Sequence, residues 1–408
     1  MGRAKERMIE QDAREYDKND CYICADCLTD KFLKRYIKHH AVQSTCDYCK
    51  KKSKKNIAAE FDGVMRLIMD GINFYWHDPV NEIAYDSGED GYQAETKDTG
   101  DILCELGITE NDKVFKAIEK SITNTHWIEH EYYCGTEDEI LHYGWTAFCE
   151  AVLYRSRYLF LASMKDKYVS ADISPADFLD RLASILNNKL EEFVVQTITK
   201  NKKIYRVIKG KKRYTTAKSL GAPPNQDAIF SNRMSPAGIS MFYGAFDKET
   251  AIIESGTSIN DDNIVSIGTF LPLRPLRLLN LYKLPDIPSV FDFERQQLIY
   301  PLRFLKAFSD DIAKPIERDG REHIDYVPSQ IVTEYFRHIY RTNSDKQLDG
   351  ILYKSAKNES KSSCVLFLEN HQACDQKEKS KPEHILRLVK VEHINTNKYL
   401  LMLYSIEN

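Results

Sequence analysis

The chain has 408 residues, 42% of them hydrophobic, which is enough for two or three domains that each bury a core. Its net charge of −4 gives it no overall basic character, so bulk electrostatics do not indicate a nucleic-acid binder. No stretch approaches the roughly 18 consecutive apolar residues of a transmembrane helix, so we expect no membrane span and no membrane partner. Residues 1–20 are charged and lack an apolar core, so we expect no secretory signal and a cytoplasmic protein.

Five of the ten cysteines are concentrated between residues 21 and 49. Two C-x-x-C pairs, Cys24/Cys27 and Cys46/Cys49, are separated by 18 residues, which is within the range of a four-cysteine zinc site. In a chain without an export signal, clustered cysteines favour a metal over disulfides. Four thiolates leave no open coordination position, so we predict a structural rather than a catalytic zinc ion.

Other readings of this segment stay open. Cys21, three residues before Cys24, is an alternative ligand, and His39 and His40 are weaker ones. Free cytosolic thiols are the plain alternative to a metal site. Residues 50–55 read KKKSKK. This basic run is a candidate for contact with nucleic acid, but a solvated turn after the metal site is the default that we favour.

The rest of the N-terminal half is predicted to be mainly helical. Apolar residues between the two cysteine pairs have the i, i+4 spacing of a helix. Residues 77–100 are acidic and rich in Gly and Asp, which indicates a loop, and residues 123–144 show no clear period. The helices that we expect lie at residues 57–76, 101–106, 110–122, 145–162 and 174–197.

From residue 203 the pattern changes to short strands with helices between them. Strands are expected at residues 204–208, 239–246, 264–270, 276–281, 350–354, 364–368, 385–391 and 399–405. Helices are expected at residues 289–313 and 327–341, with another starting at Asp247. The mixture predicts an α+β protein, in which a mainly helical N-terminal domain precedes a bent mixed sheet flanked by helices.

Residues 231–254 carry the densest set of chemically useful side chains. The stretch reads as turn, strand, turn and helix start. Arg233 lies in the first turn, Tyr243 lies near the end of the strand, and Glu254 lies in the helix that Asp247 is suited to cap. An anion binder, an aromatic ring and a carboxylate are therefore placed at or near the ends of elements.

This stretch resembles the RES domain, a family of NAD-consuming toxins named for an arginine, a glutamate and a serine. Residues 232–238, NRMSPAG, take the place of the family's first motif, and Tyr243 and Glu254 take the next two positions. Residues 205–207, YRV, stand where the family has its leading arginine, and residues 349–355, DGILYKS, match its strand ending in serine. Residues 325–330, DYVPSQ, resemble a segment that precedes its late helix. The resemblance spans roughly residues 200–408 and implies an ADP-ribosyltransferase-like fold.

The resemblance also implies roles for single residues. Cleavage of the nicotinamide–ribose bond passes through an oxocarbenium-like transition state, which a carboxylate stabilises while an arginine holds the pyrophosphate. An aromatic ring offers its face to nicotinamide. Each residue alone also has a plain structural reading, and their joint order favours the site. The catalytic candidates are Arg206, Glu254 and Ser355, and the candidates for contact with NAD are Arg233, Tyr243 and Tyr353.

The N-terminal half resembles the HEPN-like helical region that accompanies some RES domains, through CADCLTDKFL and TCDYC. Many HEPN proteins are RNases with an arginine followed about six residues later by a histidine. Residues 145–162 contain no such pair, so RNase activity is not expected. The predicted division is a zinc-knuckle segment at 1–56, a helical HEPN-like domain at 57–200 and a RES domain at 201–408.

The leading hypothesis is an enzyme that degrades NAD by phosphorolysis or hydrolysis. Inorganic phosphate would be a second substrate in phosphorolysis, held by Arg206, Arg233 or Lys354. One alternative is an ADP-ribosyltransferase that modifies a protein, and another is a non-catalytic, zinc-dependent binding protein. The resemblance suggests restraint by an antitoxin or another regulatory protein, and a homodimer is left open.

Overall fold

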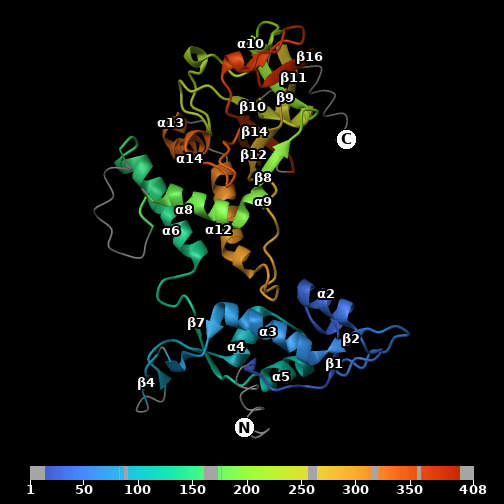
Figure 1. Cartoon of the computed structure of the whole chain (residues 1–408). Helices are drawn as coiled ribbons and strands as arrows, with labels where there is room; N and C mark the ends of the chain where they lie inside the picture. The colour runs from blue at the N-terminus through green and yellow to red at the C-terminus, as the bar shows by residue number, and fades with distance from the viewer. Residues whose placement is uncertain are drawn as a thin grey trace. The chain divides into compact units, whose positions relative to one another are not determined.

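A computed structural model of the chain describes residues 14–81, 83–86, 91–159, 173–175, 177–255, 264–314, 320–355 and 360–395. It forms two compact units (Figure 1). The first unit contains Met1–Thr136 and Ile287–Ile299, and the second contains Glu137–Asp286 and Tyr300–Asn408. None of the described helices has the length and apolar character of a transmembrane segment. The three-domain division predicted from the sequence stays a prediction.

The first unit is mainly helical, with short strands that bring distant segments together. β1 and β2 pair antiparallel, so the segments before and after α2 lie side by side. The Asp30 carboxylate caps α2 by accepting the backbone N–H groups of Phe32 and Leu33. In chain order the elements are β1 (Tyr22–Cys24), η1 (Ala25–Cys27), α2 (Lys31–His40), β2 (Ala58–Glu60), α3 (Phe61–Tyr75), β3 (Trp76–His77), η2 (Pro79–Asn81), β4 (Tyr85–Asp86), β5 (Gly91–Tyr92), β6 (Lys97–Asp98), α4 (Thr99–Leu106), α5 (Asp112–Ser121) and β7 (His126–Glu129).

The core of the first unit includes a segment from far along the sequence. One face of α3 is buried among residues of β1, α2, α4 and α5. Residues 287–299 add the Phe291 side chain to this core. Phe291 packs against Gly71, where a Cβ atom would lie only 2.5 Å from the ring, so the close approach requires glycine. Gln296 fastens the segment by donating to the Asp70 carbonyl oxygen, 2.9 Å away.

The second unit is built on a nine-stranded mixed sheet in the order β15-β16-β11-β9-β10-β14-β13-β12-β8. The pairs β12–β13 and β15–β16 are parallel, and the other neighbours are antiparallel. Its elements are α6 (Glu137–Glu150), the π-helical turn η3 (Ala151–Arg155), α8 (Phe178–Ile185), η4 (Leu186–Leu190), α9 (Glu191–Val194), β8 (Val195–Ile198), β9 (Ile204–Gly210), α10 (Ala217–Leu220), η5 (Asn225–Asp227), β10 (Phe242–Ala245), α11 (Lys248–Glu254), β11 (Ile264–Pro272), β12 (Leu276–Asn280), η6 (Gln296–Leu298, counted in the first unit), α12 (Ile299–Ala313), α13 (Glu322–Asp325), α14 (Val327–His338), β13 (Gly350–Lys354), β14 (Ser362–Leu366), η7 (Asn370–Gln372), β15 (Ala373–Cys374) and β16 (Leu386–Asn395).

Short helices cover both faces of this sheet. On one face, α10 places Leu220 in a core with Phe270. On the other face, α11 places Ile252 against Val265 and Ile267. Because successive residues of a strand point to opposite faces, β9 supplies side chains to both cores. The sheet is therefore buried on both sides near its centre.

Aromatic side chains join α6, α8 and α12 of the second unit, whose ribbons Figure 1 shows close together. Trp145 and Phe148 come from α6, Phe178 comes from α8, and Phe304 and Phe308 come from α12. Their ring centroids lie 4.9 to 6.3 Å apart. Such edge and offset contacts add to the hydrophobic stabilisation of the helices. α12 thereby links this helical layer to the segment that enters the first unit.

The α+β prediction is confirmed, with a helical N-terminal part and a mixed sheet in the C-terminal part. Several helix predictions have wrong ends. The helix expected at 57–76 begins at Phe61, because Ala58–Glu60 pairs with β1. The helix expected to reach residue 162 ends at Arg155, where Ser156 turns to an extended backbone, and the helix expected from residue 174 begins at Phe178. The helix expected to reach residue 197 ends at Val194, because Val195–Ile198 pairs with β12 as an edge strand. The helix expected from residue 289 begins at Ile299, because the residues before it turn to bury Phe291.

Three further predictions were incomplete. The helix expected from residue 145 already begins at Glu137. The loop expected at 77–100 contains the two-residue strands β4, β5 and β6. Residues 123–144, for which no element was predicted, contain β7, which pairs with β3 and β6. Strands this short carry too few residues for a period-2 pattern to be visible. Residues 399–405, a predicted strand, and 160–162, the end of a predicted helix, lie outside the described residues.

Phe291→Ala is expected to lower the free energy of unfolding by about 3–5 kcal/mol, because it empties a closed core beside Gly71. Urea denaturation followed by circular dichroism measures this change. Phe293→Ala is the matched control, since Phe293 lies two residues away and is 68% exposed. Its effect should stay within about 0.5 kcal/mol. Equal effects of the two substitutions would contradict the anchoring role of Phe291.

Candidate functional site

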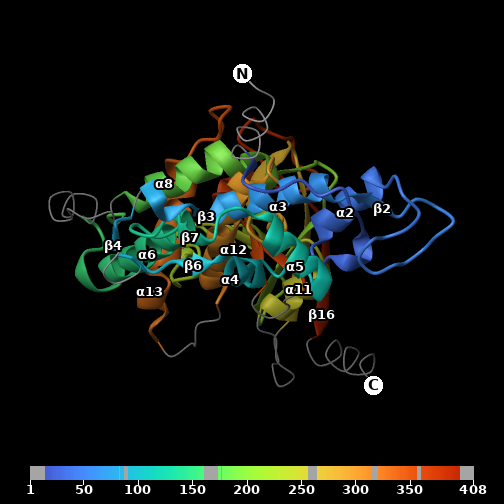
Figure 2. The same ribbon diagram turned by 90° about the horizontal axis from the view of Figure 1, so that it is seen from below.

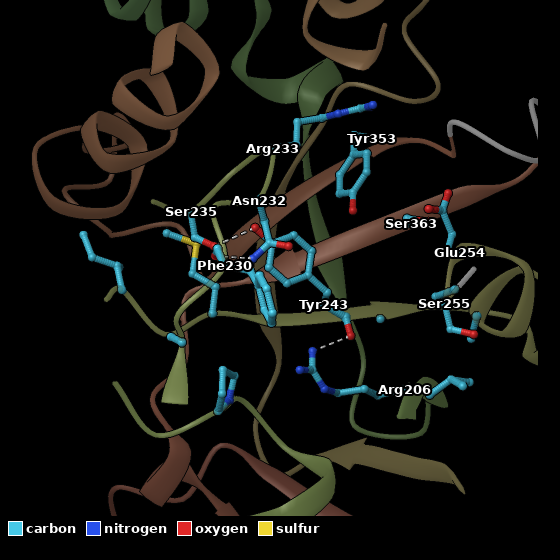
Figure 3. Close-up of a pocket in the computed structure, with 18 of the residues that line it drawn as sticks. Arg206, Phe230, Asn232, Arg233, Ser235, Tyr243, Glu254, Ser255, Tyr353 and Ser363 are labelled. Carbon is cyan, nitrogen blue, oxygen red and sulfur yellow. Dashed lines mark hydrogen bonds between the residues drawn. The ribbon is translucent and has the colours of Figure 1, made fainter. Parts of the chain in front are cut away.

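The second unit contains a cavity of about 370 Å³ beside the centre of its sheet (Figure 3). Its volume lies in the usual range for small-molecule sites. β9, β10, β13 and β14, which are neighbours in the sheet, contribute to its wall together with α11 and the loop before β10. Five of the six predicted catalytic and NAD-contacting residues line it, namely Arg206, Arg233, Tyr243, Glu254 and Tyr353.

The cavity lies where β9 and β10 separate. In the described structure these strands pair at Tyr205 and Ala245 alone, whereas each continues to pair with its other neighbour. Arg206 follows Tyr205, and its Nη1 donates to the carbonyl oxygen of Tyr243, 2.9 Å away (Figure 3). A guanidinium group therefore satisfies a carbonyl that a fully paired strand would have satisfied.

Arg206 is a cation in a largely desolvated place. Burial lowers the pKa of its guanidinium group to about 10, so the group is still charged at neutral pH. Its central carbon lies 5.2 Å from the centroid of the Phe242 ring. Its Nε is buried and has no hydrogen-bond partner in the described structure. A buried cationic donor beside a cavity favours an anionic ligand.

Tyr243 places its ring in the wall of the cavity and its hydroxyl beside Ser235. The two hydroxyl oxygens are 2.9 Å apart and share a hydrogen bond. Burial raises the pKa of Tyr243 to about 12, which keeps the phenol protonated at neutral pH. The sequence predicted a role for Tyr243 but not for Ser235, which was read only as part of a loop motif.

Tyr353, Glu254 and Ser355 meet on another wall of the cavity. The Ser355 hydroxyl donates to Glu254 Oε1. Ser355 is only 1% exposed and is absent from the residues that line the cavity, so its contact with the site runs through Glu254. Burial raises the pKa of Tyr353 well above its usual value, and nearby Tyr243 and Glu254 raise it further. Figure 3 shows the Tyr353 hydroxyl directed toward the space between Tyr243 and Glu254.

Arg233 lines the cavity but is also held by the end of α12. Its Nη1 and Nη2 donate to the carbonyl oxygens of Ala313 and Lys314, at 2.7 and 3.0 Å. These contacts satisfy carbonyls at the helix end and place a cation at the negative end of its dipole. Two of the five N–H groups are thus occupied, and fewer donors face the cavity than the sequence suggested.

The loop that carries Arg233 is fixed by α14. Gln330 Nε2 donates to Ser231 Oγ and to the Asn232 carbonyl oxygen, at 2.8 and 2.7 Å. Ser329 Oγ donates to the Arg233 carbonyl oxygen at 2.6 Å. The sequence predicted the DYVPSQ segment, residues 325–330, only as part of a family motif. The structure shows that Ser329 and Gln330 of this segment hold the loop that forms one wall of the cavity.

Several lining residues were missed by sequence reasoning. Ser363 lies beside Tyr353 and Ala245 in the sheet, and its Oγ is buried without a hydrogen-bond partner in the described structure. Tyr326, in the predicted DYVPSQ segment, also reaches the cavity, as does Phe230, which is 74% exposed. The register of β13 with β14 would have revealed Ser363, but a single sequence does not determine that register.

The four predicted zinc ligands form a separate cluster in the first unit. The Sγ atoms of Cys24, Cys27, Cys46 and Cys49 all lie within 4.8 Å of one another. Neighbouring pairs are 3.5 to 3.8 Å apart. Tetrahedral zinc with bonds of roughly 2.3 Å separates its sulfur ligands by about 3.8 Å, so the cluster is consistent with structural zinc. Cys21 is not a member of the cluster.

Two family matches cover most of the chain. Residues 39–166 match HEPN/RES N-terminal domain 1, and residues 203–389 match the RES domain. No curated protein and no solved structure matches the chain. The RES match contains every predicted catalytic and NAD-contacting position, and the other match contains Cys46 and Cys49 but begins after Cys27. The chain therefore joins a HEPN/RES N-terminal domain to a RES domain, and RES domains form a family of toxin-like enzymes that act on NAD.

Proposed function

We propose that the protein degrades NAD by breaking the bond between nicotinamide and ribose. One observation carries the proposal: a cavity in the RES domain gathers a buried arginine, an oriented carboxylate and two neutral phenols around one space. Dinucleotide cleavage needs these groups, because NAD combines anionic phosphates with a cationic nicotinamide ring.

Glu254 is assigned to the developing positive charge. The leaving nitrogen is already cationic, so the reaction needs no strong general acid, and the main demand is stabilisation of an oxocarbenium-like ribose. A carboxylate near the anomeric carbon supplies this stabilisation and can also accept ribose hydroxyl protons in hydrogen bonds. Ser355 restricts the rotation of that carboxylate by donating to Oε1. Preorganised charge of this kind lowers the barrier without reorganisation during the reaction.

Arg206 is assigned to the pyrophosphate. It remains charged in a low-dielectric place, where an ion pair with phosphate is stronger than in water. Its unpartnered Nε gives the ligand a donor that no protein group uses. The N–H groups of Arg233 that are left by the end of α12 add to the positive potential of the same cavity.

Tyr243 and Tyr353 are assigned to ring contacts and hydrogen bonds. Both phenols have raised pKa values and stay neutral at physiological pH, so neither repels the phosphates. Aromatic walls suit the flat faces of nicotinamide and adenine. Water as the nucleophile would give hydrolysis, and inorganic phosphate would give phosphorolysis. Because loss of NAD harms a cell, we also propose that an antitoxin or another regulatory protein restrains the enzyme.

We further propose that the four-cysteine cluster binds one structural zinc ion. Burial raises the pKa values of Cys24, to about 11, and of Cys27, and their hydrogen bonds with Cys49 raise them too. Thiols in such a place become thiolates only with a compensating cation, which zinc supplies. Zinc would then reinforce the hydrogen bonds between Tyr22 and Asp47 that join the two knuckles.

Glu254→Gln is expected to reduce the rate of NAD loss at least about 100-fold, because the amide cannot offset the developing charge. Purified protein is incubated with NAD, with and without inorganic phosphate, and products are separated by chromatography. Free ADP-ribose identifies hydrolysis, ADP-ribose 1″-phosphate identifies phosphorolysis, and ADP-ribose attached to protein identifies the transferase alternative. Glu249→Gln, an exposed change in the first turn of the same helix, is the control. An undiminished rate in Glu254→Gln would contradict the assignment.

Arg206→Lys is expected to lower kcat/KM for NAD about 10- to 100-fold, although the charge is kept. Lysine cannot both reach the Tyr243 carbonyl oxygen and present a planar donor pair to phosphate, and a charge-assisted hydrogen bond contributes about 1.5–3 kcal/mol. Steady-state kinetics measure the change. Arg213→Lys, an exposed position in the loop after β9, should leave kcat/KM unchanged. Equal kinetics for Arg206→Lys and wild type would remove Arg206 from the site.

Cys46→Ser is expected to abolish bound zinc and to lower the melting temperature of the protein. Elemental analysis should find about one zinc per wild-type chain, since four thiolates complete a tetrahedral site. Cys104→Ser is the control, because Cys104 is exposed and lies outside the cluster. A metal-free wild-type protein whose melting is insensitive to chelators would contradict the zinc proposal.

A further inference from the structure

The cysteine knuckles of the first unit carry a concentration of positive charge that the proposed reaction does not use. Residues 31–55 contain nine Lys and Arg residues and one acidic residue, Asp47, in a chain whose net charge is −4. We call the basic knuckle face the set formed by Lys34 and Lys38 of α2 and Lys50, Lys51, Lys52, Lys54 and Lys55 of the loop between α2 and β2. Figure 2 shows this loop projecting from the first unit.

Folding brings the two parts of this face together around Asp26. The Lys51 ammonium group donates to the Asp26 carboxylate. Lys34 of α2 lines the same hollow as Asp26. Cations from two separate elements therefore lie around one carboxylate. One negative charge is too little to neutralise them, so the face keeps a positive excess.

The neighbouring carboxylates do not cancel this excess. Asp47 accepts the backbone N–H of Tyr22 at 2.7 Å, and Asp30 caps α2. Glu110 lies near Lys34 on the wall of a shallow hollow. Against these stand lysines on an exposed loop, since residues 50–56 are all exposed. The charge is therefore available to a partner in solution.

The loop presents its lysines in a fixed arrangement. Backbone hydrogen bonds join Cys46 to Lys51 and Ser53 to Ser44, at 3.0 and 2.9 Å. Lys50 has φ of 60°, a left-handed conformation that is uncommon for residues with side chains. These contacts belong to the turn of the second knuckle, which the four-cysteine cluster requires, and the lysines that follow Cys49 on it are exposed. Lysines on a turn that is already ordered lose less conformational entropy when they bind a repeating anion than lysines on a free tail would.

An aromatic pair lies on the same helix as Lys34 and Lys38. The rings of Tyr36 and His40 stack, with centroids 4.1 Å apart and an angle of 24° between their planes. His40 Nδ1 lies 2.9 Å from the Tyr36 carbonyl oxygen, which sets the orientation of the exposed imidazole. An exposed aromatic ring on the same element as several cations is the kind of arrangement on which unpaired bases stack.

From these contacts we propose that the basic knuckle face binds single-stranded nucleic acid, with lysines on the phosphates and His40 under a base. Between residues 31 and 55, Val42 is the one large apolar side chain that the structure leaves prominently exposed. A membrane surface would require a broader apolar face beside the charges. The stacked ring distinguishes nucleic acid from an acidic protein segment, which offers carboxylates but few flat bases.

The test is fluorescence anisotropy of a labelled, mixed-sequence, single-stranded RNA with the full-length protein, at salt concentrations from about 50 to 200 mM. The variant replaces Lys50, Lys51 and Lys52 with Gln. Its affinity should fall at least about tenfold at the lowest salt concentration, and the slope of log K against log salt should become less negative by about 2, since each phosphate contact contributes roughly 0.7. Zinc content and circular dichroism check that the variant is folded.

The matched control replaces Lys377, Lys379 and Lys381 with Gln, which makes the same charge change on an exposed loop of the second unit. It should bind RNA as the wild type does. His40→Ala should weaken binding at least about fivefold without changing the salt slope, because stacking is not electrostatic.

Three outcomes would overturn the proposal: equal weakening by the two lysine triplets, an unchanged salt slope in the knuckle variant, or competition by polyglutamate that is as effective as competition by unlabelled RNA. The last result would identify an acidic protein as the partner. None of these binding measurements involves NAD. A negative result therefore does not contradict the proposed cleavage of NAD, and a protein that fails to cleave NAD can still be tested for RNA binding.

Discussion

The candidate site depends on a positive charge that is buried between two separating strands. A desolvated guanidinium group costs several kcal/mol unless it finds hydrogen-bond acceptors. Arg206 finds one in the Tyr243 carbonyl oxygen, which is available because β9 and β10 stop pairing after Tyr205 and Ala245. The separation of β9 and β10 thus provides the acceptor that the buried Arg206 guanidinium group needs, and Arg206 satisfies the carbonyl oxygen that the separation leaves unpaired. Full pairing of the strands would occupy the carbonyl and close the cavity, and an apolar side chain in place of Arg206 would leave the carbonyl unsatisfied.

The opposite wall of the cavity is a loop, and loops are mobile unless other elements hold them. Here three kinds of contact do so. The Arg233 guanidinium group donates to carbonyl oxygens at the end of α12. The backbone carbonyl oxygen of Arg233 accepts a hydrogen bond from Ser329. The side-chain amide of Gln330 donates to Ser231 before Arg233 and to Ser235 after it. The contacts to the loop are therefore made by α14 and by the end of α12, about 80 residues after Arg233 in the sequence. A wall fixed from two directions keeps the Tyr243–Ser235 pair in place, and such support is what a preorganised site requires.

The sequence could predict those features that depend on neighbours along the chain. The C-x-x-C spacing located the four sulfur atoms of the cluster, and Asp247 caps α11 as expected, accepting the Thr250 N–H at 2.9 Å. The order of motifs pointed to five residues that the fold gathers around one cavity. The burial of Phe291 in the first unit and the place of Ser363 beside Tyr353 were not predictable. Both depend on register and long-range packing, to which local periodicity is blind.

The same limit applies to charge. A net charge of −4 argued against binding to nucleic acid, but screening confines electrostatic effects to about 8–10 Å at physiological salt. A ligand at the knuckles therefore responds to the nearby lysines and to the nearby carboxylates of Asp26, Asp30 and Glu110, and not to acidic side chains farther away. Zinc with four thiolates would carry a charge of about −2, and Lys51 lies two residues after Cys49 in the sequence. Some lysines thus balance the centre itself. Nine cations in residues 31–55 exceed that need, and this excess is the basis for the proposed binding of nucleic acid at the basic knuckle face.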